Sequence, residues 1–582
     1  MSAVVANLVA RGAVRGAVRG AALAIPAFAP AAWAQEVVAS RVVFKTNAFL
    51  PGTNFIPFSL GQASIADDGR LCFSASGNPY SLGSVVVGTQ AGVSVIVGTG
   101  DAAPGVAGGV LNRVGGPRMS PNGKVVFEAT LTGPSFNTPN DDVSYVGTPG
   151  GMLFPYYRDS VIYPPMTQTF GLSNSPFVVN DAGSTIHPII TGVGSGIKSV
   201  NRVDQSGART GFTVLGETNQ YNLPAINASD YVAACILGPA LEGYLTAAPL
   251  QINLFSSTHP TLIASVGLTN QQDFAYFYDR AGGGTSGPSI SLNNARQIVF
   301  GAERYFGDGS RNNVGILNTF GTLNTWSPTQ GLRELRRDGA AAPGGGTFDF
   351  GYFTNADLYR INAKGTFTFV AANGPRPRVF GDPAPSVGLY VSNWDGTQMW
   401  RVMLQDQVIN IPGFGQAGLS APSSVFINEQ GTVVFATVAG GRQVLLRARA
   451  TTNYALELIA WGGQAVAVAS GDIRVVSSSF APLGISTALG SSGGQDGNGT
   501  LINRRGQIVY AVAFEFFNGS AIMTVNGACP ADFNADDQVD FFDYLDFAAS
   551  FSTEDPSADF NADGQVDFFD YLDFSQAFDA GC

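Results

Sequence analysis

The 582-residue chain is poor in the side chains on which most catalytic sites depend. It has two histidines and four cysteines, and charged residues make up 13% of it. His187 and His259 have no metal-ligand spacing, so a histidine-bound metal or a histidine-activated nucleophile has no support. The stretch GSSGG at residues 490–494 fits a nucleophile-elbow pattern but lies in a Gly/Ser-rich loop without strand–turn–helix context. We therefore assign no catalytic residue.

Basic charge is also scarce, with 31 Lys and Arg against 43 Asp and Glu. Fourteen of the acidic residues fall between Cys529 and Cys582, where Lys and Arg are absent, so the long segment before Cys529 is close to neutral. A near-neutral surface gives no support for a nucleic-acid partner or an anionic membrane surface. Beyond the N-terminal 34 residues no stretch approaches twenty consecutive apolar residues, so we expect no transmembrane segment.

The N-terminal 34 residues have the features of a secretory signal peptide. Arg11, Arg15 and Arg19 form a basic region, residues 21–32 are apolar, and the sequence Ala-Trp-Ala at residues 32–34 offers a cleavage site. We therefore expect a secreted protein, either extracellular or on the cell surface. The predicted boundaries are residues 1–34 for the signal peptide, 35–527 for a large domain and 528–582 for a C-terminal domain.

A short pattern, Asn-x-x-Gly followed by alternating apolar residues, recurs through the large domain. The clearest copies begin at Asn362, Asn428 and Asn503 and read NAKGTFTFVA, NEQGTVVFAT and NRRGQIVYAV. Eight units are recognisable, at intervals of 47 to 75 residues, and six carry an aromatic residue seven positions after the first. The units begin at Ala66, Ser120, Asn180, Asn227, Asn293, Asn362, Asn428 and Asn503, and the aromatics are Phe73, Phe127, Phe300, Phe369, Phe435 and Tyr510.

In physical terms, each unit is a turn that leads into a β-strand. Asn bonds its own backbone in turns, Gly takes positive φ, and the alternation that follows is typical of a half-buried strand. The spacing leaves room for three more strands in each unit, and periods of this length favour propeller blades. We therefore predict an all-β propeller of about eight blades, with a β-solenoid or two stacked sandwiches as alternatives. A second repeated element, Pro-Gly, precedes four units, at Pro51, Pro104, Pro343 and Pro412.

The C-terminal domain contains one twenty-residue sequence twice. Residues 532–551 and 559–578 agree at 16 of 20 positions. Each copy opens with the oxygen-ligand spacing of an EF-hand loop, at positions 1, 3, 5, 7, 9 and 12, and continues with aromatic and leucine residues at helix spacing. The predicted ligands of two Ca²⁺ ions are Asp532, Asn534, Asp536, Gln538, Asp540 and Asp543 in the first loop, and Asp559, Asn561, Asp563, Gln565, Asp567 and Asp570 in the second. Because so many carboxylates repel one another without cations, we expect this domain to fold only with calcium.

This domain resembles a type I dockerin, a paired calcium-loop–helix module of secreted bacterial proteins, and its closing Ala-Gly-Cys resembles the GC-type subgroup. The resemblance implies a small α-helical module that docks on a cohesin-like or other cell-surface protein. It also implies that Phe541, Phe542, Phe568 and Phe569, at loop positions 10 and 11, contact that partner. The alternative is that these rings pack between the two halves of the module. For the core of the module we expect Tyr544, Leu545, Phe547, Tyr571, Leu572 and Phe574.

The four cysteines divide into two pairs. Cys529 and Cys582 bracket the C-terminal domain, and in an oxidising compartment a disulfide between them would close the module. The alternative is a free thiol at Cys582 that serves in sorting or attachment. Cys72 and Cys235 lie in apolar, strand-like runs of different repeats, and we expect both to be buried free thiols.

The large domain resembles bacterial proteins with tandem NxxGxxxxxA repeats and varied C-terminal anchors, which implies repeat architecture and surface display but no activity. We therefore predict a secreted, non-catalytic propeller with an unidentified ligand, anchored through its calcium-dependent C-terminal domain. The alternative is a dockerin-borne hydrolase, such as a carbohydrate-active enzyme, with an unrecognised active site in the propeller. That alternative requires two carboxylates about 5–10 Å apart in one cleft.

Overall fold

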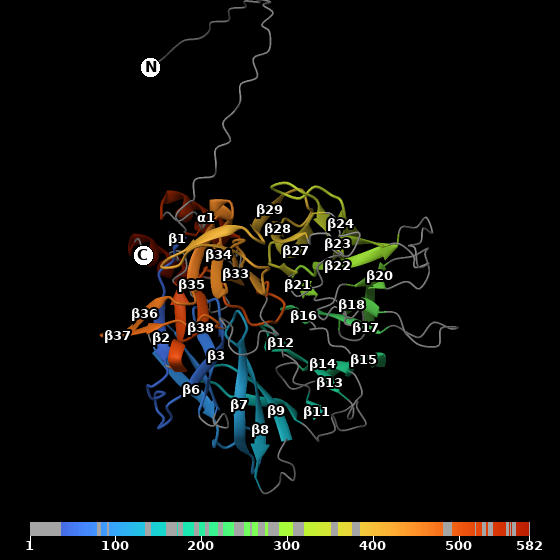
Figure 1. Ribbon diagram of the computed structural model, residues 1–582. Helices are drawn as coiled ribbons and strands as arrows, with labels where there is room; N and C mark the ends of the chain where they lie inside the picture. The colour runs from blue at the N-terminus through green and yellow to red at the C-terminus, as the bar shows by residue number, and fades with distance from the viewer. Residues whose placement is uncertain are drawn as a thin grey trace, which may run out of the picture. The chain divides into compact units, whose positions relative to one another are not determined.

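A computed structural model of the chain shows a β-rich body followed by a short helical segment (Figure 1). It describes residues 36–77, 83–89, 92–133, 141–158, 171–172, 178–190, 197–203, 209–218, 225–237, 250–256, 259–265, 274–277, 290–305, 319–350, 359–374, 385–480, 492–517, 519–525, 531–533, 539–553, 558, 560 and 566–580. Among these residues no helix is long and apolar enough to cross a membrane.

The strands form successive sheets in chain order, which we number as blades. Blade 1 holds β3 (Ser59–Ile65), β4 (Leu71–Ser76), β5 (Gly83–Thr89) and β6 (Gly92–Gly98), and blade 2 holds β7 (Val110–Met119), β8 (Val125–Thr132), β9 (Asp141–Gly147) and β10 (Leu153–Arg158). Blade 3 holds β11 (Gly171–Leu172), β12 (Val178–Val179), β13 (Thr185–Ile190), β14 (Ile197–Val203) and β15 (Arg209–Thr218). Blade 4 holds β16 (Ala225–Ile226), β17 (Val232–Leu237), β18 (Leu250–Ser256) and β19 (His259–Ser265).

The second half of the domain repeats this arrangement. Blade 5 holds β20 (Phe274–Phe277), β21 (Ser291–Leu292), β22 (Ile298–Tyr305), β23 (Thr319–Ser327) and β24 (Gly331–Arg337). Blade 6 holds β25 (Phe348–Asp349), β26 (Arg360–Ile361), β27 (Phe367–Asn373), β28 (Ser386–Ser392) and β29 (Met399–Leu404). Blade 7 holds β32 (Ser424–Ile427), β33 (Val433–Ala439), β34 (Arg442–Ala448) and β35 (Leu456–Trp461), and blade 8 holds β38 (Ile508–Ala513) and β39 (Ser520–Val525).

The two ends of the large domain meet in the last two blades. β2 (Arg41–Lys45) pairs antiparallel with β39 as the outer strand of blade 8, and β1 (Glu36–Val37) pairs parallel with β35 of blade 7. The innermost strand of blade 8 is the short stretch of Leu501 and Ile502, which bonds to β38. The N-terminal strand thus completes the last blade, and strands from both ends of the large domain share one sheet.

The fold is therefore a β-propeller, and eight blades are present among the described residues. Pairing within each blade runs antiparallel between strands that follow one another in the chain, as the turn-and-strand pattern predicted. The alternatives of a β-solenoid and of stacked sandwiches are wrong, because neither builds eight separate sheets of three to five strands in chain order.

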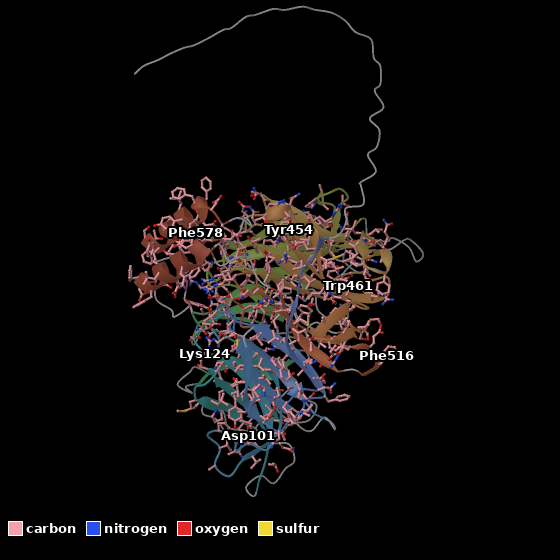
Figure 2. All side chains as sticks on the ribbon, turned by 90° about the vertical axis from the view of Figure 1, so that its left-hand side faces the viewer. Asp101, Lys124, Tyr454, Trp461, Phe516 and Phe578 are labelled. Atoms are coloured by element: carbon pink, nitrogen blue, oxygen red, sulfur yellow. The ribbon has the colours of Figure 1, made fainter. Side chains whose placement is uncertain are left out.

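The repeated aromatic residues lie in the second strand of their blades and pack between blades. Phe127 of β8 belongs to the same buried cluster as Cys72 and Val85 of blade 1, and its ring centroid is 5.3 Å from that of Tyr145. The other five repeated aromatics, Phe73, Phe300, Phe369, Phe435 and Tyr510, are at most 1% exposed. Tyr454 and Trp461, labelled in Figure 2, belong to the apolar cluster formed by residues of blades 6 and 7. The core of the domain is thus a series of apolar layers between neighbouring blades.

The Pro-Gly element is the turn of a hairpin that joins blades. Gly105 and Gly344, each following its proline, have φ of 67° and 75°, which favours glycine. A Cβ on Gly105 would lie 2.9 Å from Pro155 of β10, and one on Gly344 would lie 2.6 Å from Arg401 of β29. Each hairpin therefore packs against the outermost strand of the blade that it precedes. Two further connecting hairpins are β30 (Val408–Ile411) with β31 (Gly415–Gly418) and β36 (Ala465–Ala469) with β37 (Asp472–Val475).

The C-terminal segment contains α1 (Phe541–Ser552) and α2 (Phe568–Ala580), the helices that follow the two copies of the predicted calcium loop. Two 3₁₀ turns, η2 (Ala450–Thr452) and η4 (Glu515–Phe517), lie in the large domain. We call the described part of residues 531–580 the C-terminal module.

Candidate functional site

Each Asn-x-x-Gly turn is held by the side chain of its own asparagine. In blade 6 the Oδ1 of Asn362 accepts a hydrogen bond of 2.9 Å from the backbone N–H of Thr366. The backbone N–H of Asn362 donates to Thr366 O at 2.9 Å, and Gly365, with φ of 80°, donates to Asn362 O at 3.1 Å. The asparagine side chain therefore accepts from the backbone N–H of the residue four positions later, whereas in a usual Asx turn the donor is two positions later. Glycine supplies the positive φ that the turn requires.

The same asparagines bond the blades to one another. The Nδ2 of Asn362, which is fully buried, donates to the backbone oxygen of Asn428 in the next blade at 2.7 Å. Six consecutive blade boundaries repeat this bond. The donors and acceptors are Asn180 to Asn227, Asn227 to Asn293, Asn293 to Asn362, Asn362 to Asn428, Asn428 to Asn503, and Asn503 to Ala66. We call this set the asparagine ring.

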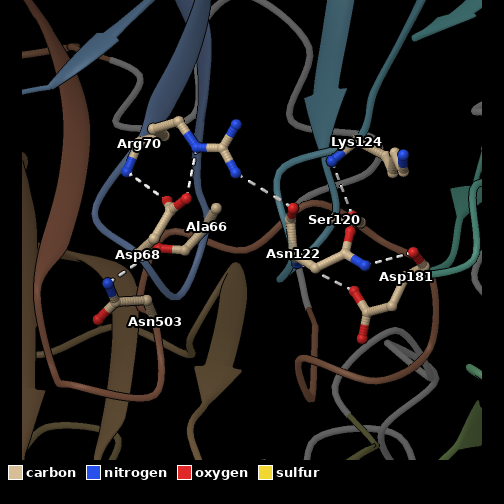
Figure 3. A network of polar contacts seen from close by, with 8 residues as sticks. All are labelled: Ala66, Asp68, Arg70, Ser120, Asn122, Lys124, Asp181 and Asn503. Atoms are coloured by element: carbon tan, nitrogen blue, oxygen red, sulfur yellow. Dashed lines mark hydrogen bonds and ion pairs between the residues drawn. The ribbon is translucent and has the colours of Figure 1, made fainter. Parts of the chain in front are cut away.

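Blades 1 and 2, where the first residue is not asparagine, close the asparagine ring by other bonds (Figure 3). The backbone N–H of Asp67 donates to Pro121 O at 2.7 Å. Asn122 donates to Asp181 through its side-chain amide and, at 3.0 Å, from its backbone N–H to the Oδ1 of Asp181. Arg70 joins the same region by pairing with Asp68 and donating to Asn122 O at 3.3 Å. The ring of turns is thus continuous around all eight blades.

The centre of the propeller is occupied by the chain itself, in a stretch of residues 492–502 that we call the central segment. Backbone N–H groups of the innermost strands donate to it at 2.8–3.1 Å, from Ile65 of blade 1, Val179 of blade 3, Ile226 of blade 4 and Ile427 of blade 7. Its end then forms the innermost strand of blade 8. One segment therefore accepts backbone hydrogen bonds from the inner strands of four blades.

Inside the central segment a buried carboxylate organises the turn. Asp496 is fully buried and accepts from Ser492 Oγ at 2.9 Å, from the backbone N–H of Asn498 at 3.1 Å and from Ser291 Oγ of blade 5 at 3.5 Å. Ser492, from the GSSGG stretch, is likewise fully buried. In the sequence, the one sign of this role is the glycine-rich stretch SGGQDGNG at residues 492–499, which lies outside the turn-and-strand pattern and was not predicted to fill the centre.

Four charged side chains gather at one opening of the asparagine ring, each from the second position of its turn. They are Asp67, Asp181, Glu429 and Arg504, from blades 1, 3, 7 and 8. Burial raises the pKa of Asp181 to about 6, against the hydrogen bond from the Asn122 backbone, and burial likewise raises the pKa of Asp67 and Glu429. The carboxylates of Asp67 and Asp181 accept backbone N–H groups of Arg504 and Asn122, so both serve the turns.

In the C-terminal module the residues at loop positions 9 and 12 form matching helix caps. The backbone N–H of Asp540 donates to Asp543 Oδ2 at 2.8 Å, and Asp540 Oδ1 accepts from Phe542 N at 2.8 Å. Asp567 and Asp570 repeat the first bond at the same distance before α2. Such a capping box fixes the start of each helix. Asp543 and Asp570 are fully buried, and Asp532 is 6% exposed.

The other predicted ligands lie outside the described residues. They are Asn534, Asp536, Gln538, Asp559, Asn561, Asp563 and Gln565. The described residues contain no group of three or more His, Cys, Asp and Glu placed to hold a metal ion. Calcium binding by the two loops therefore remains a prediction.

The two helices pack through a pair of stacked rings. Phe547 and Phe574 lie 4.0 Å apart at an interplanar angle of 5°, and both are fully buried. The hydroxyls of Tyr544 and Tyr571 are 3.2 Å apart. The prediction that Leu545 and Leu572 belong to this core is wrong: both are 45% exposed, because Phe533, Phe560, Phe551 and Phe578 surround the stacked pair instead.

The predicted partner-binding rings are exposed. Phe541, Phe542, Phe568 and Phe569 each expose 64% of their surface, so the alternative that they pack between the halves of the module does not hold. Phe541 stacks at 6.4 Å on Tyr544, and Phe568 at 6.3 Å on Tyr571, so the two copies present the same arrangement. Their contact with a partner remains a prediction.

Two of the four cysteines, Cys72 and Cys235, lie among the described residues. Cys72 is a buried free thiol whose Sγ lies 3.1 Å from Ser64 Oγ, and burial raises its pKa to about 12. Cys235 lies in β17. Cys529 and Cys582 fall outside the described residues, so their predicted disulfide remains a prediction.

Comparison with known proteins adds little about function. Residues 4–201 match a family of unknown function, DUF7453, and no curated protein matches the chain. Solved structures that resemble it include a propeller named Dos1, at 8% identity over 73% of this chain and 94% of that one, with a TM-score of 0.31. Virginiamycin B lyase from Staphylococcus aureus matches at 11% identity over 71% and 94%, with a TM-score of 0.30.

The tricorn protease matches 70% of this chain at 11% identity with a TM-score of 0.37, and the match spans only 34% of the protease chain. Scores this low carry no functional inference, and the fold assignment stands on the eight sheets of the chain itself.

Proposed function

We propose that the chain is a secreted, non-catalytic β-propeller protein, held outside the cell by a dockerin-like C-terminal module that binds two calcium ions. The observation that carries this proposal is the duplicated loop sequence whose last ligand, Asp543 or Asp570, is fully buried in both copies. Burying a carboxylate is costly unless hydrogen bonds or a cation compensate it. Asp543 and Asp570 accept backbone hydrogen bonds, residues 529–582 contain no Lys or Arg, and calcium would supply the positive charge.

The donor set of the module suits calcium, which prefers carboxylate and carbonyl oxygens. Positions 1, 3, 5, 9 and 12 of each loop would supply side-chain oxygens, and Gln538 and Gln565 at position 7 would supply backbone carbonyls. Bound calcium would reduce the repulsion between the loop carboxylates and so favour the folded module over the unfolded module. The role of this chain's own residues is to present the oxygens, with the capping boxes at Asp540 and Asp567 fixing where each helix starts.

The partner of the module, a cohesin-like or other cell-surface protein, would contact the exposed phenylalanine pairs. Four aromatic rings exposed to 64% on a small domain form the kind of apolar surface that marks a protein interface. Because the pairs occur once in each copy, either half of the module offers the same rings.

The propeller then serves as the displayed body. Its centre is filled by the central segment, so a ligand would bind to loops at the rims rather than within the channel. Two of the partly buried acids at the opening of the asparagine ring, Asp67 and Asp181, accept backbone hydrogen bonds in the turns, which supports a structural role over acid–base catalysis.

The test is calcium-dependent retention of the full-length protein on the envelope of its source cell. We expect the wild-type protein to bind in calcium and to be released by chelator. A variant with all four phenylalanines changed to alanine should bind at least tenfold more weakly while keeping its calcium-dependent circular dichroism spectrum. Binding that survives both chelator and the fourfold substitution would contradict the proposal.

A further inference from the structure

The turn of blade 8 differs from the other seven in charge. The second and third positions of the eight turns read Asp-Asp, Pro-Asn, Asp-Ala, Ala-Ser, Asn-Ala, Ala-Lys, Glu-Gln and Arg-Arg. Only the last turn, with Arg504 and Arg505, carries two cationic side chains. It is also the turn that lies nearest in sequence to the C-terminal module, whose segment holds fourteen acidic residues and no basic one. Such complementary charge favours contact between the two.

Arg505 contacts the module directly, at the second residue of the second loop. Its Nη2 donates a hydrogen bond to the backbone oxygen of Phe560, and its guanidinium lies over the Phe560 ring, 5.2 Å from the centroid. A guanidinium stacked on an aromatic ring while donating to a carbonyl is a geometry that lysine does not reproduce.

Phe560 links this contact to the predicted last ligand of the second loop. Its backbone N–H donates to Asp570 Oδ1 at 2.6 Å, while Asp570 Oδ2 accepts from Asp567 N. The ring of Phe560 also packs edge-on against Phe574, with centroids 5.5 Å apart, in the core of the module. One residue therefore connects blade 8, the buried carboxylate and the helix core.

We propose that Arg505 docks the second half of the C-terminal module on blade 8, so that the module is a fixed extension of the propeller and not a freely jointed tail. The docking fixes the direction in which the exposed phenylalanine pairs face relative to the displayed body. Phe533 and Phe560 both pack against the module's core, and the contact with Arg505 is made by Phe560 of the second copy. The expectation that the docked module also binds calcium rests on the proposed function.

Hydrogen–deuterium exchange of the full-length protein in calcium tests the docking. In Arg505→Ala we expect the peptide containing Phe560 to exchange at least fivefold faster than in the wild type, because its carbonyl and ring lose their partner. The peptide containing Phe533 is the internal control and should not change. Lys364→Ala is the matched variant, since Lys364 is an exposed cation at the same position of the blade 6 turn, and it should exchange as the wild type does.

Equal exchange at Phe560 in the wild type and in Arg505→Ala would overturn the docking proposal. The same experiment in chelator separates the two proposals. If chelator leaves exchange in α1 and α2 of the wild type unchanged, the calcium-dependent function fails, while the comparison at Arg505 still decides the docking.

Discussion

The asparagine at the head of each turn performs two tasks with one side chain. Its oxygen accepts from the residue four positions later and its amide nitrogen donates to the next blade, as in Asn362. No other residue has a donor and an acceptor on so short a side chain, apart from the rotating hydroxyls of Ser and Thr. The repeated Asn is therefore set by the contact between blades as well as by the turn.

Replacing Asn362 by alanine should destabilise the propeller by about 2 kcal/mol, because it leaves the N–H of Thr366 without its partner and removes one of the two hydrogen bonds that the buried carbonyl of Asn428 accepts. Asn393→Ala is the control: its Oδ1 accepts from Gln398 N at 2.9 Å in an exposed turn, and its loss should cost less than about 1 kcal/mol. Chemical denaturation in calcium measures both. Equal losses in the two variants would show that the asparagine ring adds nothing beyond turn formation.

Asp181 makes stability depend on pH. Burial raises the pKa of this carboxyl from 3.8 to about 6, so its ionised form opposes folding. This penalty is fully present above pH 6 and disappears as pH falls from 6 towards 3.8, where the unfolded chain also binds the proton. Asp181→Asn retains an oxygen for the Asn122 N–H and should stabilise the protein at pH 7 by about 1 kcal/mol, allowing for partial exposure of the side chain.

The measurement is the melting temperature of wild type and Asp181→Asn at pH 7 and at pH 5. The advantage of the variant should shrink at the lower pH. An advantage that is absent at pH 7, or that grows on acidification, would rule out the ionised carboxylate as a cost.

At the scale of elements, the central segment is held by close backbone approach. A Cβ on Gly493 would lie 1.9 Å from the carbonyl oxygen of Ile361, and neither backbone can yield without moving blade 6. The neighbouring Gly494 has φ of 83° and open space around it. Substitutions at these two positions therefore distinguish the effect of a steric clash with blade 6, at Gly493, from the effect of a positive φ, at Gly494.

Gly493→Ala should therefore destabilise the propeller by more than about 4 kcal/mol, within the range that marks a steric clash in a core. Gly494→Ala should cost only about 1 kcal/mol, from the left-handed conformation alone. Thermal unfolding of the two purified variants, or the soluble yield if Gly493→Ala does not fold, provides the comparison. Similar behaviour of both would mean that the central segment is not packed against blade 6.

The elements also show where sequence reasoning works. The turn-and-strand pattern predicts the second strand of each blade, because a turn and the strand after it are local features. The prediction that these strands are half-buried is wrong for those that hold Phe369 and Tyr510, which are buried on both faces because each blade packs between two others. It does not predict the central segment, whose bonds reach Ile65 and Val179 hundreds of residues away. Nor does helix spacing distinguish Leu545, which is exposed, from Phe547, which is buried, since the larger rings compete for one small core. Burial of a residue in a small module is decided by which rings meet, and periodicity alone does not show that.

At the scale of the whole molecule, the protein consists of a near-neutral propeller and an acidic C-terminal module. The propeller is completed by its own N-terminal strands and its own central segment, so its stability does not require a ligand in the channel. The module, in contrast, concentrates fourteen carboxylates without a basic residue of its own. Calcium is therefore expected to stabilise the module and to leave the propeller nearly unchanged.

Calorimetric titration of calcium into the full-length protein tests the central claim most directly. We expect two ions per chain in the wild type and none in the double variant Asp543→Asn and Asp570→Asn, whose amides keep the size of the buried side chains but remove their charge. The propeller should melt at the same temperature in both proteins. If the wild type shows no calcium binding, or if the double variant binds two ions with unchanged affinity, the C-terminal module is not the calcium-dependent anchor described above.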